Sequence, residues 1–284
     1  MSRPRVILVE DDASVRRFVA LALEELPIEL AAFDTVAGAL AALAQAPACL
    51  VLTDLMLPGE SGQALVERLT ADPALRGPAR VAVFSAGLTP EVRERLAGLG
   101  VWRLLSKPVS LAELEGCVRE AMEAAAGWPR TGLAAAPPSA GSAGPGGAPA
   151  ADAAGHPAAG APSRLQPAPL SAPAAERHAA AVATHFGGDA ELFKLYRASC
   201  LQQFAADCRA GDAALAAADW PALRRLAHSL KTVLLTLGEP RASADAAALE
   251  AACARGEQAF AGQRWPALRA QLLTLGHPAE PDSK

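Results

Sequence analysis

The sequence predicts two domains of different fold class, an α/β doubly wound domain with a five-stranded parallel sheet and an all-α antiparallel helical bundle. Three observations support this prediction. Short apolar runs alternate with helical patterns over the first 126 residues, helical patterns alone follow from about residue 190, and a stretch rich in Ala, Pro, Gly and Ser lies between. We expect this stretch to be a disordered linker, because it offers too little apolar surface to offset the entropy of ordering.

These changes in composition set the expected boundaries. We place the α/β domain at 1–126, the linker at 127–175, the helical bundle at 176–278 and a short tail at 279–284. A chain of 284 residues is long enough for two such domains, each with its own core. With a linker of this length, we expect the two domains to tumble independently, without a fixed interface.

Five strand-like runs and five helical patterns alternate in the first domain. The strands are expected at Val6–Val9, Ile28–Phe33, Cys49–Thr53, Val81–Phe84 and Val101–Leu105. The helices are expected at Ala13–Leu26, Thr35–Ala46, Ser61–Thr70, Pro90–Leu99 and Leu111–Ala125. Strands that are separated by helices pair in parallel, which is why the alternation predicts a doubly wound sheet.

Composition and charge exclude several classes of function. The net charge is -4 and no Lys/Arg-rich run or zinc-finger spacing occurs, so we expect no nucleic-acid partner. Five cysteines are scattered without a CxxC pattern, which suits a reducing compartment. The N-terminal apolar run is too short for a signal peptide, and no later apolar span has membrane length. We therefore expect a soluble, cytoplasmic protein with no membrane insertion.

Polar side chains follow four of the five expected strands. Glu10 and Asp11 follow the first strand, Asp54 the third, Ser85 the fourth and Lys107 the fifth. The carboxyl ends of parallel strands face one crevice, so these side chains should converge. Three carboxylates at close range would raise one another's pKa, and the cluster therefore implies a bound cation. Oxygen ligands with room for water and a phosphate oxygen favour Mg²⁺.

With these residues in place, the sequence resembles the response-regulator receiver family over roughly residues 4 to 125. The motifs that carry the resemblance are Val9-Glu10-Asp11-Asp12, Thr53-Asp54-Leu55-Met56-Leu57-Pro58-Gly59, Phe84-Ser85-Ala86 and Ser106-Lys107-Pro108. The resemblance implies a flavodoxin-like fold with Asp54 as the phosphoacceptor. It implies that Asp11, Asp54 and the Met56 carbonyl bind Mg²⁺ directly. It also implies that Glu10 binds the ion through a water molecule.

The chemistry that this resemblance implies follows from charge. The Asp54 carboxylate attacks phosphorus, while Mg²⁺, Lys107 and the Ser85 hydroxyl neutralise the phosphoryl oxygens. We expect Asp12 to cap the next helix instead of binding the cation. The family usually carries an aromatic residue three positions before the lysine, and here that position is Leu104. We expect phosphorylation of Asp54 to be unaffected by this difference. In the family, rotation of the aromatic side chain reports phosphorylation to partners, and Leu104 has no aromatic ring to do so.

One histidine of the second domain lies on a strongly patterned helix. The helix starts after Asp219, with Pro221 near its first position. At about 100° per residue, His228 lies roughly 160° from the centre of the apolar face. We therefore expect His228 to be exposed. Lys231 follows three positions later, close enough on the helix surface to meet a phosphoryl group on the imidazole.

The surroundings of His228 resemble the histidine phosphotransfer (HPt) family over about residues 178 to 277. The likeness is carried by Ala227-His228-Ser229-Leu230-Lys231, Gly238, Leu249-Glu250 and Gly187-Gly188-Asp189-Ala190-Glu191-Leu192. It implies that His228 carries phosphate to or from receiver aspartates and that Lys231 offsets the phosphate charge. A neutral imidazole nitrogen is a suitable nucleophile, and such a domain needs no ATP site.

Together, these resemblances imply a two-component phosphorelay protein that is not itself an ATP-dependent kinase. Its expected partners are a histidine kinase and other receiver domains. An alternative keeps the receiver active but makes the helical domain a protein-binding module. Thr232 favours this alternative, because the family usually has glycine four positions after the histidine. A DNA-binding transcription factor is disfavoured, because no basic recognition helix is present.

Overall fold

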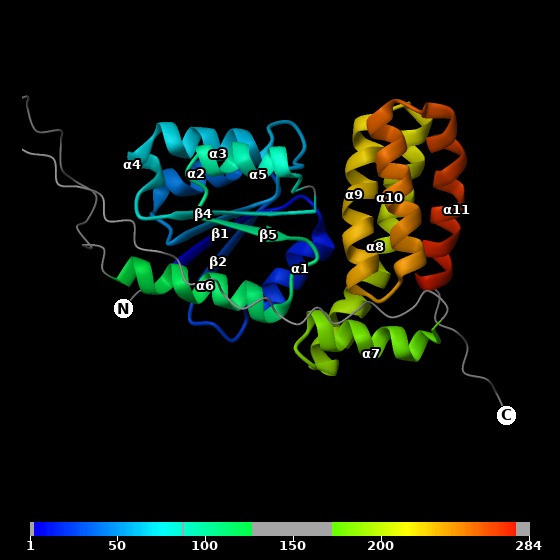
Figure 1. Ribbon diagram of the computed structural model, residues 1–284, viewed down its shortest axis with the longest axis horizontal. Helices are drawn as coiled ribbons and strands as arrows, with labels where there is room; N and C mark the ends of the chain where they lie inside the picture. The colour runs from blue at the N-terminus through cyan, green and yellow to red at the C-terminus, as the bar shows by residue number, and fades with distance from the viewer. Residues whose placement is uncertain (1–2, 87, 127–171, 277–284) are drawn as a thin grey trace, which may run out of the picture.

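Figure 1 shows the computed structural model of the chain, which describes residues 3–86, 88–126 and 172–276. The first domain contains a parallel five-stranded sheet with the strand order β2-β1-β3-β4-β5. Its strands are β1 Arg5–Val9, β2 Glu29–Phe33, β3 Leu50–Thr53, β4 Arg80–Ser85 and β5 Arg103–Ser106. The strand order reverses direction between β1 and β3, which places a crevice beyond the carboxyl ends of these two strands.

Helices cover both faces of the sheet, as the alternating pattern predicted. They are α1 Ala13–Ala22, α2 Val36–Gln45, α3 Gly62–Ala71, α4 Pro73–Arg76, α5 Pro90–Gly98 and α6 Leu111–Ala126. Val6 and Leu8 pack with α1 and α6, whereas Ile7 and Val9 pack with α2, α3 and α5. Alternate residues of β1 thus enter two separate cores, because successive side chains of a strand point to opposite faces.

The second domain is helical throughout its described part, 172–276. Its helices are α7 Ala174–His185, α8 Ala190–Ala216, α9 Trp220–Thr236, α10 Pro240–Arg255 and α11 Gln258–Gly276. Helices α8 to α11 pack side by side, and α7 lies at one end of this bundle (Figure 1). Asp219 caps α9 as predicted, accepting a hydrogen bond from the Ala222 N–H at 2.9 Å. Helix α7 begins within the range that we predicted as linker.

The two domains pack against each other, so the expectation that they lack a fixed interface is wrong. Phe18 of α1 lies edge-on to Phe186 and Tyr196, at ring-centroid distances of 5.6 and 5.5 Å. Buried residues of both domains form one continuous apolar cluster. The expectation rested on linker composition alone and ignored the apolar surfaces that α1 and α8 present to each other. Most of the predicted linker, including its predicted disorder, lies outside the described residues.

Within the described ranges, we find no helix that combines the length and the apolar character needed to span a bilayer.

Candidate functional site

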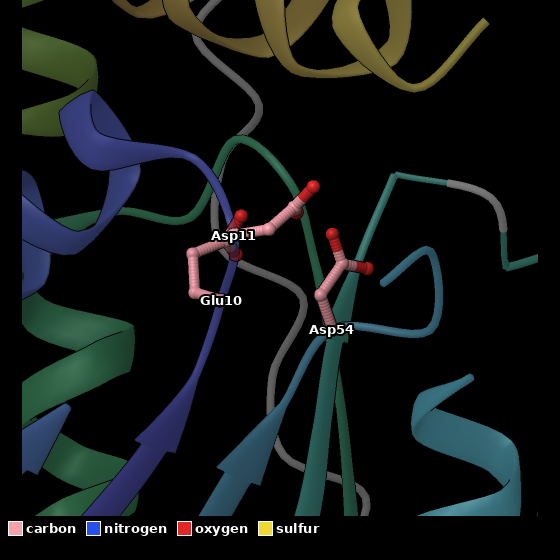
Figure 2. Close-up of side chains that lie close together, drawn as sticks. All are labelled: Glu10, Asp11 and Asp54. Atoms are coloured by element: carbon pink, nitrogen blue, oxygen red, sulfur yellow. The ribbon is translucent and has the colours of Figure 1, made fainter. Parts of the chain in front are cut away.

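Three carboxylates gather beyond the carboxyl ends of β1 and β3. Each of Glu10, Asp11 and Asp54 offers a carboxylate oxygen within 4.8 Å of the others. Figure 2 shows Asp11 and Asp54 extending toward each other from the two strands, with helices of the second domain passing above them. Glu10 is fully buried and Asp54 is only 1% exposed. The predicted convergence of these acidic side chains is therefore found in the structure.

Lys107 connects two of these acids. Its Nζ donates hydrogen bonds to Glu10 Oε2 at 2.5 Å and to Asp54 Oδ2 at 2.7 Å. Burial raises the pKa of Glu10 to about 8, in spite of the adjacent ammonium group. Burial also opposes ionisation of Asp54, but Lys107 outweighs it and holds the pKa of Asp54 below its usual value. Asp54 is thus an ionised, oriented carboxylate, the form that a nucleophile requires.

The same cluster fits a divalent cation. One lysine cannot offset three carboxylates, and burial, with a smaller effect of the Asp54 charge, raises the pKa of Glu10. The pKa of Asp11 is raised as well, by burial and by the nearby Asp54 charge. The donors are all oxygens, as hard cations prefer. Glu10, Asp11 and Asp54 are therefore candidate ligands.

Backbone groups around Asp54 complete this side of the site. The N–H groups of Leu55 and Met56 donate to Asp54 Oδ1 at 2.5 and 3.3 Å. Ser85 is buried and forms a hydrogen bond with Asp54 that lowers its pKa. Asp12 caps α1, accepting from the Val15 N–H at 2.8 Å, as predicted. The role of the Met56 carbonyl as a cation ligand stays a prediction.

Gly62 is a residue of this site that sequence reasoning missed. A Cβ atom at Gly62 would lie 1.7 Å from the Asp54 carbonyl oxygen, so only glycine lets α3 start this close to the loop. We predicted a helix beginning at Ser61 but gave the next residue no role. The signal was the glycine itself, which is a poor helix former placed directly after the capping serine.

His228 of α9 is buried, and the expectation that it would be exposed is wrong. The residue is only 2% exposed. Its Nδ1 lies 2.7 Å from Glu250 Oε1 of α10, and Lys231 Nζ donates to Glu250 Oε2 at 2.6 Å. Helical periodicity locates the strongly apolar face of α9 but does not show what covers its other sides, and here α10 contacts His228 through Glu250. Lys231 joins the site through the carboxylate that it shares with His228.

Glu250 determines which nitrogen of His228 is free to react. Although burial opposes its ionisation, hydrogen bonds from His228 and Lys231 lower the pKa of Glu250 to about 2. An ionised carboxylate only accepts hydrogen bonds, so the Nδ1 atom of His228 must carry the proton. Nε2 is buried and makes no hydrogen bond to any residue that the structure describes. In the neutral ring this nitrogen keeps its lone pair. Glu250 was part of the quoted resemblance, but we assigned it no role.

The two halves of the site face each other across the domain interface. His228 lies near enough to Asp54 that a positive charge on the protonated ring would lower the pKa of that carboxyl. Beside them is a half-open cleft of about 380 Å³, with lining residues from both domains. These include Asp11, Asp12 and Arg16 from the first domain, and Asp207, Arg225 and Ser229 from the second. Thr232 is buried as well, and its Oγ1 makes no hydrogen bond within the described ranges.

Comparison with known proteins divides the chain in the same way. The family model described as "Response regulator receiver domain" matches residues 6–119, and the one described as "Hpt domain" matches residues 196–277. The response regulator receiver protein CpdR of Brucella abortus (strain 2308) is 32% identical over 122 residues, which cover 43% of this chain and 98% of that protein.

Two further proteins resemble the first domain. Hybrid signal transduction histidine kinase D of Dictyostelium discoideum is 33% identical over 113 residues, which cover 40% of this chain and 7% of that kinase. The crystal structure of a CheY-like response regulator receiver domain protein from Methanospirillum hungatei JF-1 aligns with a TM-score of 0.40 and 23% identity. This alignment covers 43% of this chain and 97% of that structure. The fold assignment therefore rests on strand order and on the family match.

Proposed function

This chain belongs to the response regulator receiver family and also carries an Hpt domain, and from this premise we propose that Asp54 and His228 are its two phosphoryl carriers. The two domains make it a two-component phosphorelay protein, and such domains interact with histidine kinases and other phosphorelay components. One observation carries the assignment of the carriers. The ionised Asp54 and the free Nε2 side of His228 lie buried together at one domain interface.

The exchange of phosphate between these residues balances without any other reactant. In the direction from Asp54 to His228, the Nε2 lone pair forms a bond to phosphorus. The bond between phosphorus and the Asp54 oxygen breaks, and the electron pair returns to the carboxylate. Lys107 neutralises the carboxylate as it leaves, and the Nδ1 proton stays on the ring, hydrogen-bonded to Glu250. The reverse transfer uses the same groups.

We propose Mg²⁺ as the cation, held by Asp11 and Asp54 directly, by Glu10 through water and by the Met56 carbonyl. When bound, Mg²⁺ neutralises charge on the phosphoryl oxygens and so lowers the barrier to transfer. The residues of the chain supply the remainder of the site. Lys107 holds Asp54 in place, Ser85 reaches the same carboxylate, and burial keeps water from the reacting atoms.

We propose a histidine kinase as the source of phosphate and other receiver domains as further partners. The alternative, a helical domain that only binds proteins, gives no reason for a buried histidine aligned by a carboxylate. The hydrogen bonds from His228 and Lys231 to Glu250 therefore favour phosphate transfer.

The test labels the full chain with a small phosphodonor in the presence of Mg²⁺. An acyl phosphate on Asp54 is labile in base, whereas a phosphoramidate on His228 is labile in acid. Asp54→Ala should abolish the base-labile label, His228→Gln should abolish the acid-labile label, and removal of Mg²⁺ should abolish the label on Asp54. Base-labile labelling of Asp54→Ala at the level of the unmodified chain would remove Asp54 from its role.

A further inference from the structure

The interface between the two domains resembles a protein interior. Phe18 projects from α1 of the receiver and packs against two aromatic rings of the bundle, Phe186 and Tyr196, which also contact each other. All three side chains are buried. Large aromatic residues that are buried at the centre of an interface commonly dominate its binding energy. Phe18 is therefore the apolar anchor of this contact.

Two further contacts surround this anchor. Ser14, one turn before Phe18 on α1, is buried and forms a hydrogen bond with Cys200 of α8. At the start of α6, Leu111 lies close to Gly187, in the loop that joins α7 to α8. Helix α8 and the α7–α8 connection of the bundle thus meet three side chains of this receiver, and each contact depends on the identity of those side chains.

Docking in this way makes His228 inaccessible to any other protein domain. Its ring is buried, with Glu250 on the Nδ1 side and the receiver's Asp54 near the ring. The adjoining cleft of about 380 Å³ is far too small for a second receiver. A receiver from another chain could reach His228 only after this chain's own receiver has left.

We propose that the aromatic face of Phe186 and Tyr196 is a docking surface selective for the chain's own receiver, so that His228 is reserved for Asp54 and withheld from other receivers. The inference rests on the proposed phosphoryl carriers. The covalent connection between the domains adds to this selectivity, because it holds the receiver at an effective concentration on the order of millimolar. Transfer from His228 to another chain then requires α1 to separate from α8.

A reversible cross-link tests the docked state in the full chain. Ser14→Cys places a thiol beside the native Cys200, and mild oxidation should join them within one molecule. Arg17→Cys is the matched control, because Arg17 lies on the exposed face of the same helix. The Ser14→Cys bond should be found by peptide mapping in monomeric protein, and Arg17→Cys should not form a bond to Cys200. A bond that forms only between two chains would overturn the proposal.

The accessibility of His228 gives a second readout that involves no phosphate. Diethyl pyrocarbonate acylates accessible neutral imidazole, and peptide mapping measures the rate at His228. We expect Phe18→Ala to raise this rate about tenfold or more, since removing a central aromatic anchor costs at least one decade of an equilibrium constant. Leu195→Ala, which changes a 58% exposed residue elsewhere on α8, should leave the rate unchanged. Equal rates in the unmodified chain and in Phe18→Ala would overturn the proposal.

The final step combines the cross-link with transfer between chains. A donor chain carrying Asp54→Ala and Ser14→Cys is phosphorylated on His228 and then oxidised, and a second chain carrying His228→Gln is the acceptor. Transfer to the acceptor should fall severalfold on oxidation and recover on reduction. Transfer that is equally fast in the oxidised donor would show that docking does not withhold His228. Failure of His228 to take up any phosphate would instead count against the proposed function, because the cross-link and the acylation do not depend on it.

Discussion

At the scale of single residues, the pair of His228 and Glu250 determines the chemistry of the second domain. Nδ1 donates to a carboxylate whose pKa lies at about 2, so this carboxylate stays ionised through the physiological range. The proton is thereby held on the nitrogen that faces α10. The other nitrogen, Nε2, is left with its lone pair in the neutral ring. Glu250 acts through His228 and is a positioning residue.

Glu250→Gln should slow phosphorylation of His228 by about 10- to 100-fold, because a hydrogen bond to a charged group contributes about 1.5–3 kcal/mol. The acid-labile label measures this rate, and ¹⁵N NMR of the imidazole measures the balance of the two tautomers. Glu257→Gln is the control, since that exposed carboxylate pairs with Arg255 and not with His228. If Glu250→Gln shifts neither the rate nor the tautomer, the positioning role is wrong.

Local spacing predicted the capping residues and the acidic cluster, because these depend on neighbours in sequence or on the ends of adjacent strands. Asp12 and Asp219 both cap helices as expected. The burial of His228 could not be predicted in this way, since the receiver that helps to cover it lies far away in sequence. The surroundings of Trp102 could not be predicted either. The guanidinium groups of Arg80 and Arg103 lie 4.4 and 4.6 Å from the centroid of its ring, and the alternation of side chains along a strand does not reveal such a contact.

At the scale of elements, the bundle depends on one close approach between α8 and α11. A Cβ atom at Gly211 would lie 2.0 Å from the ring of Trp265, which is fully buried. The indole Nε1–H donates to Asp212 at 2.8 Å, so the ring cannot easily move aside. A glycine in the middle of a helix is costly by itself, and the packing of this large ring against α8 explains its presence.

Gly211→Ala should therefore destabilise the bundle by about 1–3 kcal/mol, as overpacking of a filled core does. Chemical denaturation of the full chain, followed by helical circular dichroism, measures this loss. Gly262→Ala is the matched control, because its Cβ would lie 3.8 Å from Leu215, an ordinary contact, and alanine favours a helix. Equal stability of the two variants would contradict the packing argument.

Element boundaries were less predictable than element types. The five strands and the longer helices follow from periodicity and from apolar runs. Helix α4, Pro73–Arg76, is only four residues long and shows no periodicity that a sequence pattern can detect. Helix α1 ends at Ala22, before the predicted Leu26, because the chain after Leu23 turns toward β2.

At the scale of the whole molecule, Asp207, which is buried, and His185, which is half-buried, titrate in opposite senses near the docked interface. Burial raises the pKa of Asp207 to about 7, with a further increase from Asp12 across the interface and a decrease from its Gln203 hydrogen bond. Arg16 and Arg225 line the same cleft. An acid whose pKa is raised on docking favours the docked state while it is protonated. The contribution of Asp207 therefore declines as the pH rises from its ordinary value of 3.8 to about 7.

His185 has the opposite effect. Burial lowers its pKa from 6.5 to about 4, and the nearby Glu113 offsets only part of this change. Burial favours the neutral ring, so the contribution of His185 to docking grows as the pH rises from about 4 to 6.5. The two groups partly cancel over this range. The unmodified chain should then show a flatter pH dependence of docking than either single variant.

Small-angle X-ray scattering measures the docked fraction as a function of pH. In Asp207→Asn, docking should strengthen between pH values of about 4 and 6.5, because the opposing titration of Asp207 is removed while that of His185 remains. In His185→Gln, docking should weaken as the pH rises to about 7, because the opposing titration of His185 is removed while that of Asp207 remains. Parallel curves for the two variants would contradict these assignments.

The central claim is that Asp54 and His228 exchange phosphate within one molecule, and the concentration dependence of this exchange tests it most directly. The full chain is labelled briefly on Asp54 with Mg²⁺ present, and the acid-labile label is followed after serial dilution. A docked pair predicts a first-order rate that dilution leaves unchanged, with the acid-labile label absent in His228→Gln. A rate that falls in proportion to protein concentration, or an acid-labile label that persists in His228→Gln, would contradict it.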